Sequence, residues 1–220
     1  MPEIKTLIRK PTEVIQHLVA YAEYRLNELE IKQTDKCTVI VTGKIDVGKT
    51  SFVQQLIEAF KEKQLKVSGI YSRKVYENNK RIGYDLVDIK TNTFEPFLQI
   101  NGKQRDGIGM FKILPRGLQF GIESLKSANN GNSDIVIVDE IGKLELSGKG
   151  WIGQVKQLIT LQQTHLLLVI NEKFLEEFSE QLDLKNTLLI TIPTNNFSEA
   201  FERIYWFYRK VLILDLYQKM

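Results

Sequence analysis

Residues 43–50 read GKIDVGKT, between the apolar run CTVIV and the segment SFVQQLIEAF. The first flank is β-branched and continuous, which is typical of a strand covered on both faces of a parallel sheet. The second flank has the apolar spacing of a helix. The stretch between them fits GxxxxGK[ST], a spacing that gathers backbone N–H groups and a lysine around a polyphosphate at the positive end of a helix. It therefore predicts a phosphate-binding loop (P-loop).

Each residue type in this stretch has a chemical reason. Gly43 allows the chain to turn sharply off the strand, and Gly48 lets the main chain approach phosphate where a Cβ would collide. Lys49 can reach the β- and γ-phosphates, and the Thr50 hydroxyl can ligate Mg²⁺. The candidate nucleotide-binding residues are Gly43, Lys44, Ile45, Asp46, Val47, Gly48, Lys49 and Thr50.

A second signal lies at residues 135–140, which read IVIVDE. In P-loop enzymes an aspartate at the end of another buried strand also holds the Mg²⁺, and Asp139 follows four apolar residues here. The next residue, Glu140, can accept the proton of an attacking water beside that metal site. We therefore take Lys49 and Glu140 as candidate catalytic residues, and Thr50 and Asp139 as candidate Mg²⁺ ligands.

Two other nucleotide-dependent classes fit less well. A GTPase switch would carry Asp-x-x-Gly after its second strand, as residues 139–142 do, but it also needs Asn-Lys-x-Asp to read guanine. The nearest match, residues 171–174 (NEKF), lacks the lysine and the terminal acid. A small-molecule kinase would need an arginine-rich lid over the phosphates, and the arginines here are scattered. They include Arg73, Arg81, Arg105 and Arg116. Glu140 favours hydrolysis.

Composition limits the remaining classes. A chain of 220 residues that is 43% hydrophobic can bury one substantial core. A formal net charge of +3 gives no support to nucleic-acid binding. The single cysteine, Cys37, excludes an internal disulfide and fits a reducing compartment. No apolar run approaches the roughly 20 residues that span a bilayer, and the first ten residues lack the apolar core of a signal peptide. We expect a cytoplasmic protein without a membrane partner.

Strand and helix patterns alternate along the chain. The spacing predicts a helix over residues 12–30, strands at 38–42 and 66–72, a helix at 50–62, and a hairpin within 75–89 that turns at Asn78 and Asn79. Short extended pieces follow at 97–100 and 111–114. Helices are then predicted at 118–128, 151–163 and 173–182, and strands at 134–140, 165–170 and 187–192. This order predicts an α/β fold whose mostly parallel sheet carries helices on both faces.

The two ends extend beyond this core. We expect a single domain over residues 1–220, with a core at about 37–197, a helical extension at 1–36 and a last helix at about 198–219. The aromatic residues of the last helix predict packing against the sheet or the first helix. The alternative is a homodimer or partner surface, since exposed aromatic residues mark interfaces. Both histidines, His17 and His165, are expected to be surface or packing residues.

Two blocks of sequence carry a resemblance. VDEIGKLEL, at Val138 to Leu146, resembles the DEIGKMEL signature of the P-loop nucleoside-triphosphatase family of thermophile enzymes and the human cancer-related NTPase. GIYSRKVYENNKRIGYDLVDI, at Gly69 to Ile89, is similar to that family's GFYTEEVRE and RVGFDIVDL segments. The likeness covers about residues 37–197. It implies an α/β P-loop sheet and Mg²⁺-dependent hydrolysis of ATP, GTP and other nucleoside triphosphates with little base selectivity.

The resemblance also implies roles for individual residues. Mg²⁺ support would come from Asp139 and water activation from Glu140. Phosphate contacts would come from Gly43, Gly48, Lys49, Thr50 and Ser51. Lys143 and Glu145 match the signature too, with no role derived from their chemistry.

The sequence departs from the family at three places. The family loop reads GPPGVGKTT, so Lys44, Ile45 and Asp46 lose a glycine and add a carboxylate. Asp46 should repel nucleotide unless it points away or pairs with Lys44. The family's Glu-Glu-Val-Arg is replaced by RKVY at residues 73–76, and its Glu-Asn-Arg by NNF at residues 195–197. If the lost arginines stabilise the transition state, Arg73, Arg81 or Arg116 would have to replace them.

Two alternatives to a hydrolase stay open. One is a nucleotide-binding adaptor with little turnover, in which the terminal helices dock a partner. The other is a nucleotide or nucleoside kinase, which would transfer the phosphoryl group to an acceptor in preference to water.

Overall fold

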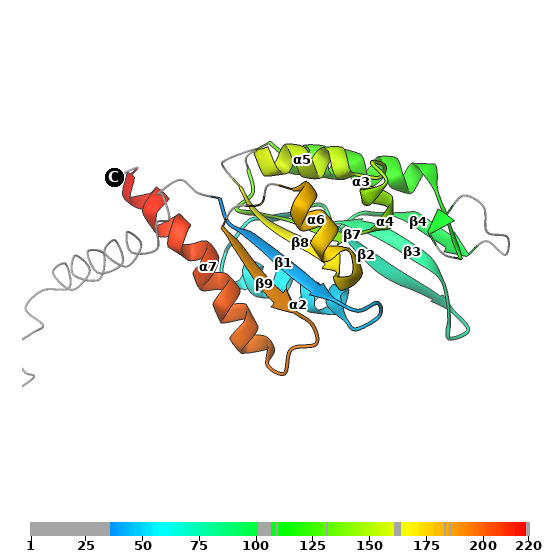
Figure 1. Ribbon diagram of the computed structural model, residues 1–220, viewed down its shortest axis with the longest axis horizontal. Coiled ribbons are helices and arrows are strands. Elements are labelled where there is room, and N and C mark those ends of the chain that lie inside the picture. Colours follow the sequence, from blue (N-terminus) through cyan, green and yellow to red (C-terminus); the bar gives the residue numbers. More distant parts are fainter. Residues whose placement is uncertain are drawn as a thin grey trace, which may run out of the picture.

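The computed structural model describes residues 36–100, 107–108, 110–130, 132–160, 164–182, 184 and 186–218. Within these ranges nine strands form one sheet (Figure 1). The strands are β1 (Thr38–Gly43), β2 (Val67–Glu77), β3 (Lys80–Asp88), β4 (Phe94–Ile100), β5 (Gly107–Ile108), β6 (Phe111–Ile113), β7 (Ile135–Ile141), β8 (His165–Asn171) and β9 (Thr187–Thr191). Their order across the sheet is β5-β6-β4-β3-β2-β7-β8-β1-β9.

One half of the sheet is parallel, as the sequence predicts. Strands β2, β7, β8, β1 and β9 pair in parallel along this order. Every residue of β1 and β8 is buried, which matches their continuous apolar sequences. The carboxyl ends of β1, β8 and β7 therefore meet at one edge of the sheet, where open α/β sheets bind ligands.

The other half is antiparallel, and it is larger than expected. The hairpin of β2 and β3 turns at Asn78 (φ 47°) and Asn79 (φ 61°), as predicted. It is not an appendage, because β3, β4, β6 and β5 continue the sheet by antiparallel pairing. The expectation of a mostly parallel sheet is corrected to a sheet divided evenly between the two kinds of pairing. In β4 only Phe97 is fully buried, so the alternation that identifies a strand was weak there.

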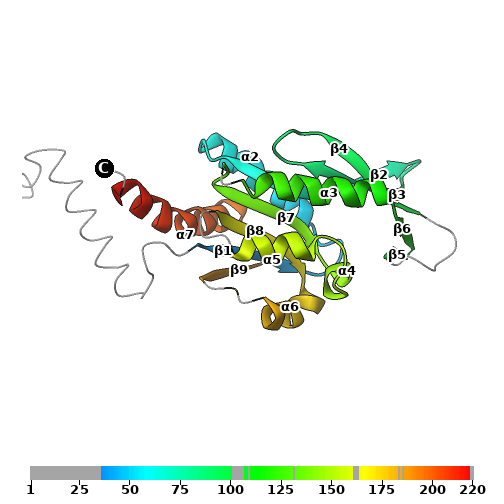
Figure 2. The ribbon, with the colours of Figure 1, turned by 90° about the horizontal axis from the view of Figure 1, so that it is seen from above.

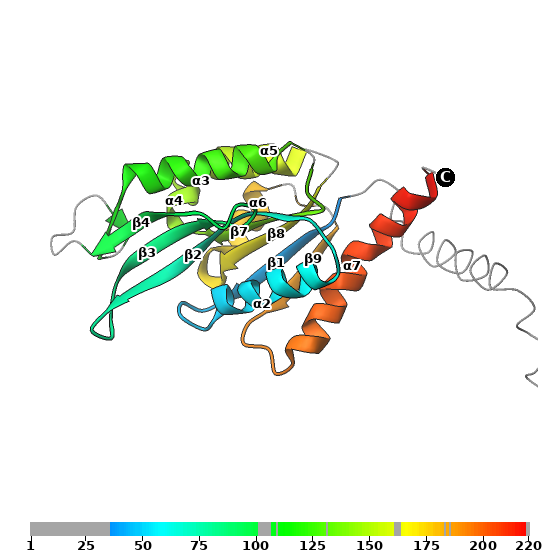
Figure 3. The same ribbon diagram turned by 180° about the vertical axis from the view of Figure 1, so that it is seen from behind.

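Helices cover both faces of the sheet, which confirms the α/β class. One face carries α2 (Lys49–Glu62) and α7 (Phe197–Gln218), which lie in front of the sheet in Figure 3. The other carries α3 (Pro115–Ala128), α5 (Ile152–Thr160) and α6 (Leu175–Gln181), and Figure 2 shows α3 and α5 side by side. The short helix α4 (Lys143–Leu146) directly follows β7.

The pleat of the strands divides the core between these faces. In β1, Val39 and Val41 pack in the cluster with α2 and α7, whereas Ile40 belongs to the cluster with α3, α5 and α6. This is the alternation of side chains that a strand imposes. Strands β1 and β8 are consequently covered on both faces, whereas β4, β9 and the outer halves of β2 and β3 keep exposed side chains.

The last helix packs on the sheet, which was the first of the two expectations for it. Tyr208 is fully buried, and its hydroxyl donates to the carbonyl oxygen of Leu166 at 2.7 Å. The His165 ring lies 5.2 Å from the Tyr208 ring, and its Nδ1 accepts the N–H of Cys37 at 3.1 Å. His165 is therefore a packing residue. The homodimer stays a prediction, and the expected helix over 12–30, with His17, lies outside the described residues.

In the part of the chain that the structure describes, no helix combines the length and the apolar character needed to cross a bilayer.

Candidate nucleotide-binding and hydrolytic site

The P-loop connects β1 to α2, and its two glycines occupy the conformations that it requires. Gly43 has φ of +152°, and a Cβ there would overlap the carbonyl oxygen of Ile192 at the end of β9. Gly48 has φ of +102°, and a Cβ there would meet no atom of the described residues within 4 Å. The main chain is thus turned tightly at Gly43 and left uncovered at Gly48, on the side where a phosphate would approach.

Helix α2 begins with free amide groups. Gly48 is its N-cap, no described side chain caps its first turn, and no acidic residue lies in that turn. The first N–H groups of a helix have no partner inside the helix, and they carry the positive end of its dipole. The start of this fourteen-residue helix is therefore an electrostatic site for an anion.

Lys49 is folded back into the loop. Its side chain is 4% exposed, and its ammonium donates to the carbonyl oxygens of Gly43 at 3.0 Å and Lys44 at 2.8 Å. It also lies 3.7 Å from a carboxylate oxygen of Glu140. The cation is thus positioned between the loop and the end of β7, which are separated in the sheet by β8.

Asp139 is a fully buried carboxyl group at the end of β7. Burial, followed by the negative charge of Glu140, raises its pKa to about 7, while Thr50 and Lys49 oppose the rise. The Thr50 hydroxyl is close enough to lower this pKa, yet neither oxygen of Asp139 has a hydrogen-bond partner of ordinary geometry among the described residues. A buried acid without partners is costly unless a ligand completes it.

This arrangement fits Mg²⁺. The described residues contain no cluster of three or more histidine, cysteine, aspartate or glutamate side chains that would enclose a metal. Mg²⁺ does not need one, because it is usually held by one or two protein oxygens, with phosphate oxygens and water filling the other positions. The orphaned oxygens of Asp139, beside the Thr50 hydroxyl, are such a partial ligand set.

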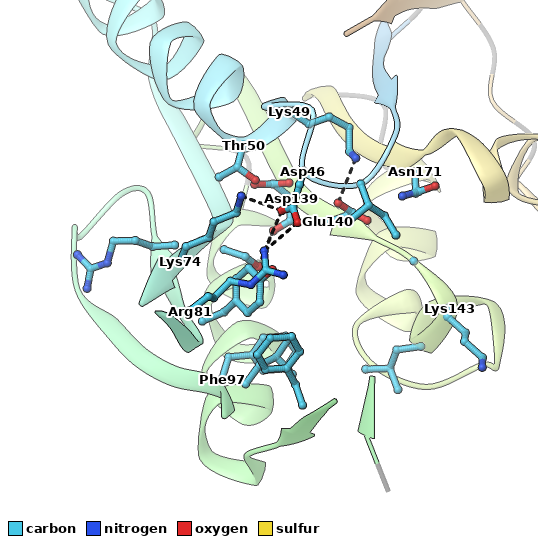
Figure 4. Close-up of a pocket in the computed structure, with 18 of the residues that line it drawn as sticks. Asp46, Lys49, Thr50, Lys74, Arg81, Phe97, Asp139, Glu140, Lys143 and Asn171 are labelled. Atoms are coloured by element: carbon cyan, nitrogen blue, oxygen red, sulfur yellow. Dashed lines mark hydrogen bonds and ion pairs between the residues drawn. The ribbon is translucent and has the colours of Figure 1, made fainter. Parts of the chain in front are cut away.

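Glu140 points into the same space as Lys49 (Figure 4). Its side chain is 39% exposed. Burial raises its pKa, and the nearby Lys49 ammonium opposes that rise. A carboxylate that retains contact with solvent, close to the phosphate-binding lysine, can accept a proton from water.

Asn171 is a site residue that the sequence reasoning did not identify. It ends β8, the strand between β1 and β7, so the strand order brings it next to Lys49 and Glu140 (Figure 4). It is 5% exposed, and its side-chain oxygen accepts the N–H of Lys173 at 3.0 Å, which orients the amide. In the sequence, Asn171 is a polar residue directly after the apolar run of 166–170, a pattern that could have predicted a site residue. It was considered only as the first residue of a possible guanine motif.

Glu145, which matched the family signature without a role, is 3% exposed. One of its carboxylate oxygens accepts the N–H of Gly142 at 3.0 Å, closing the first turn of α4. Burial raises the pKa of Glu145 to about 7. Its contact braces the turn directly after Asp139 and Glu140. Lys143, by contrast, is exposed.

The extra carboxylate of the loop has partners that were not foreseen. Asp46 does not pair with Lys44; it binds Lys74 at 2.8 Å and Arg81 at 2.8 and 3.0 Å, both from the β2–β3 hairpin. Of the other arginines considered, Arg73 pairs with Asp85 at 2.8 Å. Arg116 lies 3.5 Å from Glu95, and Arg105 falls outside the described residues.

A single cavity of about 760 Å³ unites these groups. The P-loop residues Ile45, Asp46, Gly48, Lys49, Thr50 and Ser51 line it, together with Asp139 and Glu140. Gly43, Lys44 and Val47 belong to the loop but are not lining residues. The opposite wall is largely apolar and comes from the antiparallel half of the sheet, from α4 and from Trp151, which directly precedes α5. It includes Tyr84, Phe97, Phe111, Leu144 and Trp151.

Comparison with known proteins agrees with this geometry. The model of the NTPase family matches residues 38–205. Nucleoside-triphosphatase THEP1 of Methanocaldococcus jannaschii is 26% identical over 167 residues, which cover 76% of this chain and 94% of the relative.

Two solved structures share the fold. The crystal structure of THEP1 from Aquifex aeolicus aligns with a TM-score of 0.62 at 21% identity, over 76% of this chain and 96% of that chain. The solution structure of a human cancer-related nucleoside triphosphatase aligns with a TM-score of 0.62 at 24% identity, over 77% and 95%. The chain belongs to the NTPase family of P-loop proteins.

Proposed function

We propose that this protein is a Mg²⁺-dependent nucleoside triphosphatase that releases the γ-phosphate of ATP, GTP and other nucleoside triphosphates. The observation that carries the proposal is the buried carboxyl of Asp139. It has no hydrogen-bond partner among the described residues, and it lies beside Thr50 in the cavity that also contains Lys49 and Glu140. Burial of this carboxyl group without a hydrogen-bond partner would lower the stability of the protein, whereas a bound metal and phosphate would give its oxygens a partner.

The chemistry follows from the residues present. The P-loop amides and the start of α2 would bind the phosphate oxygens, and Lys49 would neutralise charge on the β- and γ-phosphates. Thr50 and Asp139 would hold a Mg²⁺ ion, whose chemistry in this site would be to stabilise the negative charge that develops on the phosphates. Glu140 would accept a proton as the water oxygen attacks the γ-phosphorus. The bond from that phosphorus to the β–γ bridging oxygen would break, giving a nucleoside diphosphate and inorganic phosphate.

Low base selectivity is part of the proposal. The segment that would read guanine in a GTPase, residues 171–174, lacks the acid that pairs with the guanine edge. In the structure Asn171 ends β8 and residues 172–174 form a short 3-10 helix. The Asn171 side chain lies near Lys49 and Glu140 (Figure 4). We expect ATP, GTP and CTP to be hydrolysed at comparable rates.

Phosphate release with and without the Glu140→Gln change tests the proposal. The substitution keeps shape and removes the proton acceptor, so we expect release to fall by about a hundredfold or more, with nucleotide still bound. Glu177→Gln, an exposed change on α6, is the matched control and should release phosphate at the wild-type rate.

Two results would speak against hydrolysis. Background release by both the wild type and Glu140→Gln, with nucleotide bound, would identify a binding module; the carboxylate that Asp46 adds to the loop is the observation in favour of that alternative. Transfer of the γ-phosphoryl group to an added hydroxyl compound, in preference to water, would identify a kinase.

We further propose a cytoplasmic setting, with the nucleoside triphosphate as the small-molecule partner and no membrane or nucleic-acid partner. The lone cysteine, Cys37, is buried and has no second cysteine in the sequence with which to form an internal disulfide, and the modest net charge of +3 gives no support to nucleic-acid binding. Fractionation of cells that produce the full chain, followed by detection of the protein, tests the location.

A further inference from the structure

The loop carboxylate of Asp46 is held by two cations that come from the far side of the site. Asp46 lies between β1 and α2, whereas Lys74 and Arg81 project from β2 and β3, beyond β7 and β8 in the sheet. Figure 4 shows both cations converging on Asp46 beside Thr50 and Asp139. The contact therefore crosses the mouth of the phosphate cavity, and all three side chains line that cavity.

The backbone at Asp46 is the unusual part of this contact. Its φ of +59° lies in the left-handed region, which glycine adopts without cost and which most other residues avoid. The loop thus keeps a left-handed position and fills it with a residue that adds negative charge next to the phosphates. Asp46 is close enough to Glu140 for its charge to raise the pKa of that carboxyl. The negative charge of Asp46 would repel a bound triphosphate unless the positive charges of Lys74 and Arg81 compensate for it.

Lys74 and Arg81 are positioned so that they can bind an anion other than Asp46. The Arg81 guanidinium lies 5.4 Å from the centre of the Tyr84 ring and 5.7 Å from that of Phe111, so two aromatic faces hold it near the cavity. The side chains of Lys74 and Arg81 remain 35% and 28% exposed. Asp46 is more exposed still, at 46%. Ion pairs between groups as exposed as these contribute little to stability, so a stronger anion can displace the carboxylate.

The γ-phosphate would be that anion. Lys49, Thr50 and Asp139 define where the β- and γ-phosphates and the metal would lie. The γ-phosphate would be the phosphate nearest Glu140, and β2, which carries Lys74, is the sheet neighbour of β7, which carries Glu140. Arginine and lysine bind phosphate oxygens through charge-assisted hydrogen bonds, which are roughly twice as strong as neutral ones.

We propose that Lys74 and Arg81 bind the γ-phosphate of an incoming nucleoside triphosphate, and that Asp46 is the anion they hold before it arrives. This inference rests on the proposed phosphate site and adds a specificity to it. A triphosphate displaces Asp46 and gains two cations, whereas a diphosphate lacks the γ-phosphate and leaves the three residues paired. Lys74 and Arg81 thereby select triphosphate over the diphosphate product.

Calorimetric binding tests this without turnover. The ligands are Mg²⁺ with ADP and Mg²⁺ with the non-hydrolysable adenosine β,γ-imidotriphosphate, and the measured quantity is the ratio of their dissociation constants. We expect Arg81→Ala and Lys74→Ala each to weaken binding of the imidotriphosphate by about tenfold or more, with ADP little changed. Asp46→Asn should tighten the imidotriphosphate more than ADP. Lys80→Ala, which removes a positive charge from the exposed end of the same hairpin, is the control and should leave the ratio unchanged.

The opposite sign for Asp46→Asn guards against a trivial loss of folding, because a damaged protein would not bind one nucleotide more tightly. The inference is overturned if Arg81→Ala and Lys74→Ala weaken both nucleotides equally. It is also overturned if Asp46→Asn weakens both, which would mean that the ion pairs stay closed over any bound nucleotide. A wild type that binds neither ligand would instead remove the proposed function.

Discussion

Replacing Glu145 by glutamine should change how the stability of this protein depends on pH. Glu145 is 3% exposed and burial raises its pKa from 4.5 to about 7, so the folded state holds its proton more tightly than the unfolded chain does. For such a group the stabilisation is complete below the unfolded pKa and is lost as pH rises through the folded pKa. At about 1.4 kcal/mol for each unit, the loss across this window is about 3 kcal/mol.

Glutamine keeps the shape and the acceptor for the Gly142 N–H, and it does not titrate. We therefore expect the variant and the wild type to have similar free energies of unfolding at and below about pH 4.5. As the pH rises from 4.5 to about 7 the variant should become progressively the more stable one, and the full difference should be reached above pH 7. Urea unfolding across this range, followed by circular dichroism without Mg²⁺ or nucleotide, measures the difference. The exposed Glu177→Gln change should track the wild type. A difference between Glu145→Gln and the wild type that is constant with pH would refute the reasoning.

Three further outcomes follow from the described contacts. Gly43→Ala should lower the free energy of unfolding by about 2–3 kcal/mol and abolish nucleotide binding, because its Cβ would overlap the Ile192 carbonyl at positive φ. Gly153→Ala is the control and should do neither, since a Cβ there would meet no described atom within 4 Å. Urea unfolding measures the stability of the two variants, and calorimetry measures their nucleotide binding. Tyr208→Phe should cost about 1 kcal/mol through the lost hydrogen bond, seen in urea unfolding, with nucleotide affinity unchanged. Asp139→Asn should raise the melting temperature of the metal-free protein above about pH 7, because it removes a buried charge. The variant should also lack the further rise in melting temperature that Mg²⁺ and nucleotide give the wild type. A melting temperature below that of the wild type in metal-free buffer would contradict this reasoning.

The parts of the site that could be predicted from the sequence are those in which neighbouring residues along the chain form a recognisable motif. The glycines at 43 and 48 and the acidic pair at 139–140 each follow a buried strand, and the parallel order of those strands brings both segments to one edge of the sheet. The hairpin turn was also local, because two consecutive asparagines tolerate the left-handed conformation.

The parts that were missed depend on contacts between distant segments. Asn171 becomes a site residue only when β8 is known to lie between β1 and β7. The pairing of Asp46 with Lys74 and Arg81 joins positions 28 and 35 residues apart, and no periodicity predicts it. The antiparallel extension was underestimated because β4 and β6 bury few side chains, so their hydrophobic pattern is faint.

The position of β8 affects how well the site keeps its geometry when parts of the protein open locally. This strand is paired on both sides, and all seven of its residues are buried. Lys49 begins α2 after the loop that leaves β1, and Glu140 lies near the end of β7, so the two strands that flank β8 position both residues. Amide hydrogens in such a strand exchange with solvent only when the whole molecule opens. We therefore expect the strands that position Lys49 and Glu140 to be among the slowest-exchanging segments of the described fold, and fraying of the hairpin turn would leave the spacing of these two residues intact.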